Sequence, residues 1–307
     1  MDPQGGRLAL EVATWQPATM DRRLIVDGKN LLWRSWDGSL GAAFKPERIV
    51  ATFFRKLVEL REHLGIRDVK IAWEGDTSRN FRLEIFKGYK AHRDEDAVGK
   101  FEVCSAIPLT IATGWHCGID QWCGQEAEGD DAIGYLSTLG PCTIASADRD
   151  LLQLVDDAKG IDVIRPPSKF ERTFCGSHGE KYDEAAVLVY YRVSASQLVD
   201  YKALVGDVGD GIPGIKGIGP KKGQALISKW ETLDAVLVAA DMGMIKSAAL
   251  TKLLVDKRSD TLMSRKLARI SRDPKHARKA IKDSDFPFSD LERATKLGVR
   301  AAWMVGL

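Results

Sequence analysis

The sequence predicts an α/β fold with a central, mostly parallel sheet and helices on both of its faces. Short apolar runs at 24–26, 69–73 and 143–146 indicate buried strands, because the strands of a parallel sheet are covered on both faces. Segments with apolar residues at helical spacing separate these runs, which is the alternation typical of α/β proteins. Each run is followed by an acidic residue, at the sheet edge where open α/β folds bind ligands.

The other elements follow in chain order. A helix is expected over 46–63, with Pro46 near its start, where proline fits the first turn. A helix over 126–139 has acidic residues in its first turn, where the helix dipole favours negative charge. The remaining expected elements are a strand at 161–164, helical structure at 182–200, a glycine-rich turn between two short helices at 201–230, and basic helical structure beyond 232.

We divide the chain into a flexible extension (1–21), an α/β domain (22–180) and a helical region with a glycine-rich hairpin at about 201–230 and a basic tail (181–307). With 307 residues, 44% hydrophobic and 29% charged, the chain is neither disordered nor fibrous. The net charge of +2 hides a split. Residues 242–307 hold 15 basic and 7 acidic side chains, which leaves 30 and 36 in residues 1–241. The basic end predicts a polyanionic partner, the alternative being a solvated helical surface.

The cysteines and the N-terminal residues predict the cellular compartment of the protein. Five cysteines without paired spacing predict reduced thiols in a cytosol. A zinc site built from His116, Cys117 and Cys123 lacks a fourth ligand. No signal peptide and no membrane span of about 20 apolar residues is expected.

A set of carboxylates stands at predicted strand ends and helix starts. Its members are Asp27, Glu74, Glu128, Asp130, Asp131, Asp148, Asp150, Asp207 and Asp210. Any one of them alone is explained as a helix cap or a surface charge, but together they repel unless cations neutralise them. Oxygen ligands without His or Cys suit Mg²⁺ or Mn²⁺. Two such ions roughly 4 Å apart support phosphodiester hydrolysis.

A glycine-rich turn precedes two lysines. Gly217, Gly219, Lys221 and Lys222 fit neither a P-loop nor a dinucleotide fingerprint, and instead resemble a helix–hairpin–helix motif. Such a hairpin presents backbone N–H groups, a helix N-terminus and lysines to a DNA phosphate. The alternative is a plain connector packed by its isoleucines.

A basic, aromatic segment lies between the second and third predicted strands. Arg82, Lys87, Lys90 and Arg93 are suited to phosphates, and Tyr89 to stacking on a base. Arg34, seven residues after Asp27, is expected to reach the same phosphate. Without the acidic residues nearby, this segment reads as a solvated amphipathic surface.

Together these motifs resemble the 5′-nuclease family, which includes phage flap endonucleases and 5′–3′ exonucleases and the 5′-nuclease domain of DNA polymerase I. The matching segments appear in the family's order and lie at 25–31, 81–93, 128–131, 147–154 and 204–223. Two positions depart from the family pattern. Glu74 stands where Asp is frequent, and Gly211 where Asn is common.

The resemblance implies a Mg²⁺-dependent nuclease for DNA with a 5′ flap, nick or end, and also for RNA:DNA hybrids. It makes the nine carboxylates metal ligands or their neighbours, and makes Lys90, Arg34 and Arg93 contacts to the scissile phosphate or 5′ end. It further implies a helical arch over about 85–125 and K⁺ at the hairpin. We expect a monomer in the cytoplasm of a bacterial or phage-infected cell, working with replication proteins. The alternatives are a non-catalytic DNA-junction binder of this fold and a related metal-dependent RNase.

Overall fold

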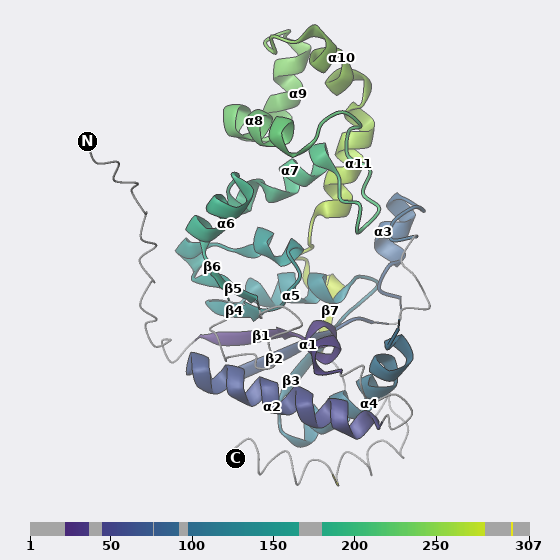
Figure 1. Cartoon of the computed structure of the whole chain (residues 1–307), viewed down its shortest axis with the longest axis vertical. Coiled ribbons are helices and arrows are strands. Elements are labelled where there is room, and N and C mark those ends of the chain that lie inside the picture. The colour runs from purple at the N-terminus through teal and green to yellow at the C-terminus, as the bar shows by residue number, and fades with distance from the viewer. Residues whose placement is uncertain are drawn as a thin grey trace, which may run out of the picture.

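The computed structural model describes residues 22–36, 45–75, 77–91, 98–165, 180–279 and 296. Seven strands form one sheet in the order β6-β5-β4-β1-β2-β3-β7 (Figure 1). Their bounds are β1 Arg23–Asp27, β2 Asp68–Trp73, β3 Asp120–Gly124, β4 Cys142–Ala145, β5 Ile161–Arg165, β6 Glu180–Tyr182 and β7 Ala277–Lys279. The central five strands pair in parallel, and the two edge strands pair antiparallel. The predicted mostly parallel sheet is confirmed.

Strand β1 shows why the sheet has a core on each face. Successive side chains of a strand point to opposite faces. Leu24 and Val26 therefore enter one hydrophobic core and Ile25 enters the other, and all three are 0% exposed. Helices α1 (Gly28–Ser35), α2 (Pro46–Leu64) and α4 (Lys100–His116) pack on the face of Leu24 and Val26. Helix α5 (Gly129–Ser137) packs on the other face.

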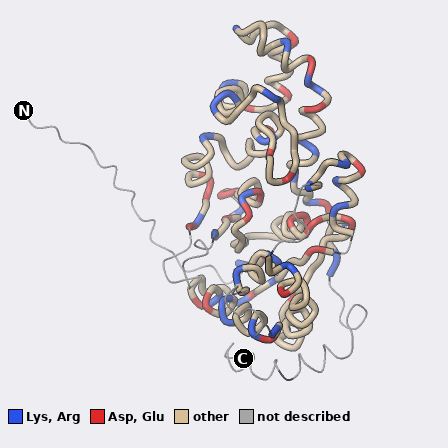
Figure 2. The backbone as a smooth tube through the Cα atoms, turned by 45° about the vertical axis from the view of Figure 1, so that its right-hand side comes forward, with Lys and Arg blue, Asp and Glu red and all other residues tan. Residues whose placement is uncertain are grey.

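The core on the α5 face continues into a helical region. Ile25 of the sheet, Leu204 and Ile227 belong to one cluster of buried residues. The helices of this region are α6 Glu184–Tyr191, α7 Leu198–Val205, α8 Pro220–Trp230, α9 Leu233–Asp241, α10 Ala248–Asp256 and α11 Arg258–Ala268. Basic and acidic residues interleave along these helices (Figure 2). Helix α11 leads back to the sheet through β7, so the helical region is tied to the sheet at both ends.

The predicted arch needs a correction. Residues 120–124 form strand β3 inside the sheet, which the sequence analysis missed because Asp-Gln-Trp-Cys-Gly contains no apolar run. Helix α4 packs its Val103, Ala106 and Leu109 against the core of the sheet. Helix α3 (Asn80–Ile85) ends where the predicted span begins, and a turn follows at 87–91. Residues 92–97, which include Arg93, lie outside the described residues.

Short 3₁₀ helices connect several of the elements above. Within the described part of the chain, short 3₁₀ helices occupy Asp150–Leu154, Asp157–Lys159, Ala195–Gln197 and Pro274–His276. Among the residues described, no helix is long and apolar enough to cross a membrane. The predicted extension at 1–21 lies outside the described residues.

Candidate active site

Asp27 is the first of the predicted carboxylates, and it lies where β1 passes into α1. Its side chain caps α1 by accepting a 3.0 Å hydrogen bond from the Asn30 N–H. The Ser146 hydroxyl donates to the other Asp27 oxygen over 2.7 Å. Because β1 and β4 pair in parallel, their ends meet at one edge of the sheet, and the Ser146 bond fixes Asp27 beside the loop that follows β4.

That loop carries Asp148 and Asp150. The Asp148 N–H donates to the Ser146 hydroxyl over 3.0 Å, and the Asp150 N–H donates to Asp148 Oδ1 over 2.8 Å. The Ala147 N–H donates to the Asn30 side chain over 3.1 Å. Residues on β1, α1 and the loop thus hold one another by short polar contacts, which makes the loop a rigid support for its two carboxylates.

Asp130 joins this group from the start of α5. Burial raises the pKa of Asp130 well above its usual value, and the carboxylates of Asp148, Asp27 and Glu128 raise it further. Burial likewise raises the pKa of Asp27 to about 6, with smaller contributions from Asp148 and Glu74. Three elements therefore bring Asp27, Asp130 and Asp148 together, and each carboxylate disfavours the charge of the others.

These acidic groups suit a hard divalent cation in their chemistry. They are all oxygen donors, and a cation would relieve the repulsion that raises the pKa values of Asp27 and Asp130. Within the described part of the chain, however, no three His, Cys, Asp or Glu side chains lie close enough together to define a metal site. Several of the carboxylates instead take lysine ammonium groups as their cations.

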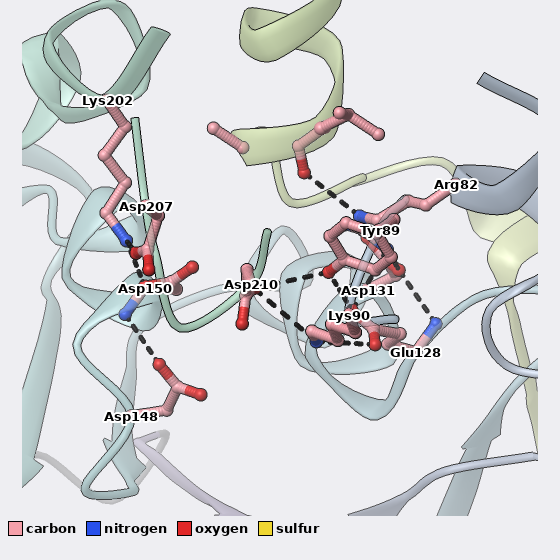
Figure 3. A network of polar contacts seen from close by, with 12 residues as sticks. Arg82, Tyr89, Lys90, Glu128, Asp131, Asp148, Asp150, Lys202, Asp207 and Asp210 are labelled. Atoms are coloured by element: carbon pink, nitrogen blue, oxygen red, sulfur yellow. Dashed lines mark hydrogen bonds and ion pairs between the residues drawn. The ribbon is translucent and has the colours of Figure 1, made fainter. Parts of the chain in front are cut away.

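Lys202 on α7 is the first of these lysines, and it lies between Asp150 and Asp207 (Figure 3). Its ammonium is 2.9 Å from Asp207 Oδ2 and also bonds Asp150. Burial opposes its charge, but Asp150 and Asp207 outweigh burial and raise the pKa of Lys202. Burial still raises the pKa of Asp150 to about 6. The sequence analysis missed Lys202, although a lysine in an apolar helix five residues before Asp207 is a usable signal.

Lys90 is the second lysine, and Figure 3 shows Asp210 between the two groups. The Lys90 ammonium lies 2.6 Å from Glu128 Oε1 and 3.6 Å from Asp210 Oδ2. Its backbone N–H donates to the Asp210 carbonyl over 2.9 Å, and Lys90 adopts φ +51°. Although burial favours the neutral acid, Lys90 and Arg82 hold the pKa of Glu128 below its usual value. The catalytic candidate Lys90 is thus bound to both acidic neighbours.

Tyr89 does not fit its predicted role as a stacking platform. Its ring is 2% exposed, and its hydroxyl donates to Glu128 Oε2 over 2.8 Å. A buried ring cannot stack on a base, so this prediction is wrong for the structure. The centre of the Tyr89 ring instead lies 4.9 Å from the Lys90 ammonium, so the two side chains form a cation–π contact.

Asp131 and Arg82 are also corrected. Their side chains are 0% and 2% exposed. Asp131 accepts two hydrogen bonds from Arg82 and further ones from the N–H groups of Glu128 and Ser271. Both Asp131 oxygens accept hydrogen bonds from the protein, and Arg82 is buried against Asp131, so the structure gives both residues a role in holding the fold together. Asp131 and Glu128 form a capping box on α5, which explains their three-residue spacing.

The other predicted residues lie as follows. Glu74 forms an ion pair with Lys29, and Lys87 is exposed. At the hairpin, Gly217 adopts φ +98°, a conformation that favours glycine. Lys221 and Lys222 are exposed in the first turn of α8, so the hairpin presents an open basic surface.

Known proteins identify the arrangement. The model of the 5′-3′ exonuclease N-terminal, resolvase-like domain matches residues 22–191, and the model of the 5′-3′ exonuclease C-terminal SAM fold matches residues 193–291. The chain belongs to the 5′–3′ exonuclease family. A 5′-3′ exonuclease of Bacillus subtilis (strain 168) is 29% identical over 261 residues, which are 81% of this chain and 83% of the relative.

Other known proteins resemble this exonuclease in sequence or in fold. DNA polymerase I of Synechocystis sp. is 32% identical over 265 residues, which are 80% of this chain but 26% of the polymerase. T5 5′-exonuclease with bound zinc superposes with a TM-score of 0.65 at 20% identity, over 92% of this chain and all of that one (100%). Human GEN1 in complex with Holliday junction DNA gives 0.58 at 14% identity, over 93% and 71%. The predicted family and fold are confirmed, and the protein is a nuclease.

Proposed function

We propose that this exonuclease is a divalent-metal-dependent, structure-specific 5′ nuclease that cuts DNA at 5′ flaps, nicks and ends. The observation that carries the proposal is the mutual repulsion of Asp27, Asp130 and Asp148 near one sheet edge, which adds to burial in raising the pKa values of Asp27 and Asp130. A protein that only bound DNA would gain nothing from negative charge at this place. Mg²⁺ or Mn²⁺, as two ions, fits the all-oxygen donor set.

The residues divide the work between metal and substrate. Bound divalent ions supply an activated water and stabilise the charge that develops on the phosphate oxygens. Asp27, Asp130 and Asp148 would hold the ions when they bind, and Ser146 and Asn30 fix the supporting loop. Lys90, Arg34 and Arg93 contact the scissile phosphate or the 5′ end. The hairpin lysines grip the duplex backbone at a distance from the cut.

Cleavage of an end-labelled 5′-flap DNA tests the proposal. The protein should cut with Mg²⁺ and stop in EDTA, and Asp148→Ala should remove cleavage while the DNA still binds. Asp256→Ala is the matched control, because Asp256 is an exposed aspartate on α10 that pairs with Lys252. Cleavage that persists in EDTA, or in Asp148→Ala, would refute the metal-dependent mechanism.

Three finer assignments belong to the same proposal. We place a K⁺ ion at the hairpin, RNA:DNA hybrids among the substrates, and a monomer beside replication proteins in the cytoplasm of a bacterial or phage-infected cell. Comparing cleavage of matched DNA and RNA flaps tests the substrate range. Comparing DNA affinity in K⁺ and in a large organic cation tests the hairpin ion.

A further inference from the structure

Arg165 ends strand β5 beside the loop that carries Asp148. Its Nε donates to the Ala147 carbonyl oxygen over 3.4 Å, and its Nη1 donates to the Tyr182 hydroxyl over 3.3 Å. The guanidinium also lies 5.6 Å from the centre of the Tyr182 ring. Strand β6 holds this arrangement, because Arg165 pairs with Glu180 two residues before Tyr182. Arg165 is therefore fixed next to the residue that precedes Asp148.

Two more guanidinium groups gather at this edge. Burial, and after it the Arg165 guanidinium, lowers the pKa of Arg34, so Arg34 and Arg165 are electrostatic neighbours. Arg149, between Asp148 and Asp150 in the chain, is exposed and lies 5.3 Å from the centre of the Tyr190 ring. We name Arg34, Arg149 and Arg165 the arginine platform.

Tyrosines link the platform into one surface. The rings of Tyr182 and Tyr190 are 6.1 Å apart in an edge-to-face contact, so the aromatic partners of Arg165 and Arg149 touch each other. Tyr190 is 44% exposed and presents a ring face or edge to whatever binds there. The Tyr182 hydroxyl also donates to Glu180 Oε2 over 2.6 Å, which fixes the orientation of the Tyr182 ring.

Like charges held near one another repel, and an anion placed among them relieves this cost. Guanidinium forks match phosphate oxygens, and an exposed tyrosine beside them suits a sugar or base. The platform flanks the carboxylate loop, so the anion that meets it is on the strand being cut.

We propose that Arg165 and Arg149, with Tyr190, form a second phosphate subsite that binds a phosphodiester neighbouring the scissile one. The proposal rests on the proposed nuclease function. It assigns to β5 and α6 a part in substrate binding that is separate from the hairpin.

The test measures flap-DNA affinity without divalent metal over a range of salt, and then KM and kcat with Mg²⁺. Arg165→Gln and Arg149→Gln should each weaken binding by about tenfold, the size of one lost charge-assisted hydrogen bond. Each should lower the slope of log affinity against log salt by roughly 1. KM should rise while kcat holds. Arg149 is exposed, so its variant keeps the test valid if Arg165→Gln folds poorly.

Lys159→Gln is the matched control. Lys159 has the same charge, is exposed, and precedes the opposite end of β5, where it pairs with half-buried Asp156, so its variant should equal wild type in every measurement. Wild-type affinity and salt slope in Arg149→Gln, or a fall in kcat at constant KM, would overturn the subsite. If the wild-type protein binds flaps but never cuts them, the nuclease mechanism fails while the binding comparison still decides the subsite.

Discussion

Arg82 and Asp131 form a two-point ion pair inside the molecule. The guanidinium Nη1 and Nη2 donate to the two carboxylate oxygens over 2.7 and 2.9 Å. The same guanidinium donates to the carbonyl oxygens of Leu267 and Arg269 over 3.1 and 3.0 Å. One side chain thus ties α3, α5 and the segment after α11 together, which sets the helical region against the sheet edge that carries the carboxylates.

Arg82→Lys should destabilise the protein by about 3 kcal/mol, since losing the geometry of a buried pair leaves its partner's charge poorly compensated. Urea unfolding measures the change. The control is Arg55→Lys, whose partner Glu59 lies one helical turn away on a solvent-facing surface of α2, and it should change stability by less than about 1 kcal/mol. Equal urea midpoints for Arg82→Lys and wild type would contradict the role of the pair.

Asp27 predicts how pH acts on the metal-free protein. Its pKa rises from 3.8 to about 6 on folding, with burial as the main cause. The folded state therefore holds this proton more tightly, so the stabilisation is complete below pH 3.8 and is lost as pH rises through about 6. The shift corresponds to about 3 kcal/mol.

Thermal unfolding in EDTA at pH 5 and pH 7 checks this sign. The melting temperature of wild type should fall between the two pH values, and Mg²⁺ should restore it more at pH 7 than at pH 5. Asp27→Asn keeps an acceptor for the Asn30 N–H and should flatten the dependence on pH while weakening the effect of Mg²⁺. A wild-type protein that gains stability between pH 5 and pH 7 would show the opposite sign.

Lys202 acts as a built-in cation for Asp150 and Asp207. Lys202→Met removes the charge and leaves two carboxylates without it, so the metal-free protein should lose about 3 kcal/mol of stability. Mg²⁺ should recover more of this loss than it adds to wild type, because the ion takes over the neutralisation. Thermal unfolding across a Mg²⁺ titration measures both effects. Lys252→Met, on an exposed pair with Asp256, should show neither.

Local patterns in the sequence predicted most of the sheet. Strands β1, β2, β4 and β5 and helix α2 lie within a few residues of their predicted bounds, because each carries a short, mostly apolar run or a clear helical period. Strand β3 is not predicted because it lacks an apolar run. Its place in the sheet comes from pairing with β2 and β7. Such pairing depends on residues far away in the chain.

The site was predicted by residue type but not by burial. Arg82, Tyr89 and Asp131 are of the right chemical types, yet they serve the fold because partners from distant segments bury them. Arg82 meets Asp131 from 49 positions away in the chain, and no spacing rule foresees this. Lys202 and Arg165 were missed for the same reason, since their significance comes from Asp150 and from Ala147, which other elements supply.

Variants of the hairpin lysines test DNA binding separately from cleavage. Lys221 and Lys222 are exposed in the first turn of α8, away from the carboxylate loop. Lys221→Gln should weaken binding to every DNA duplex alike and lower the salt slope by roughly 1, since a phosphate contact carries no sequence information. Lys222 donates to the Gly217 carbonyl over 2.9 Å, so Lys222→Gln should also loosen the hairpin and cost more affinity. Filter binding of flap and plain duplex over a salt series measures both, and a loss confined to flap DNA would show that these lysines read the junction and not the duplex backbone.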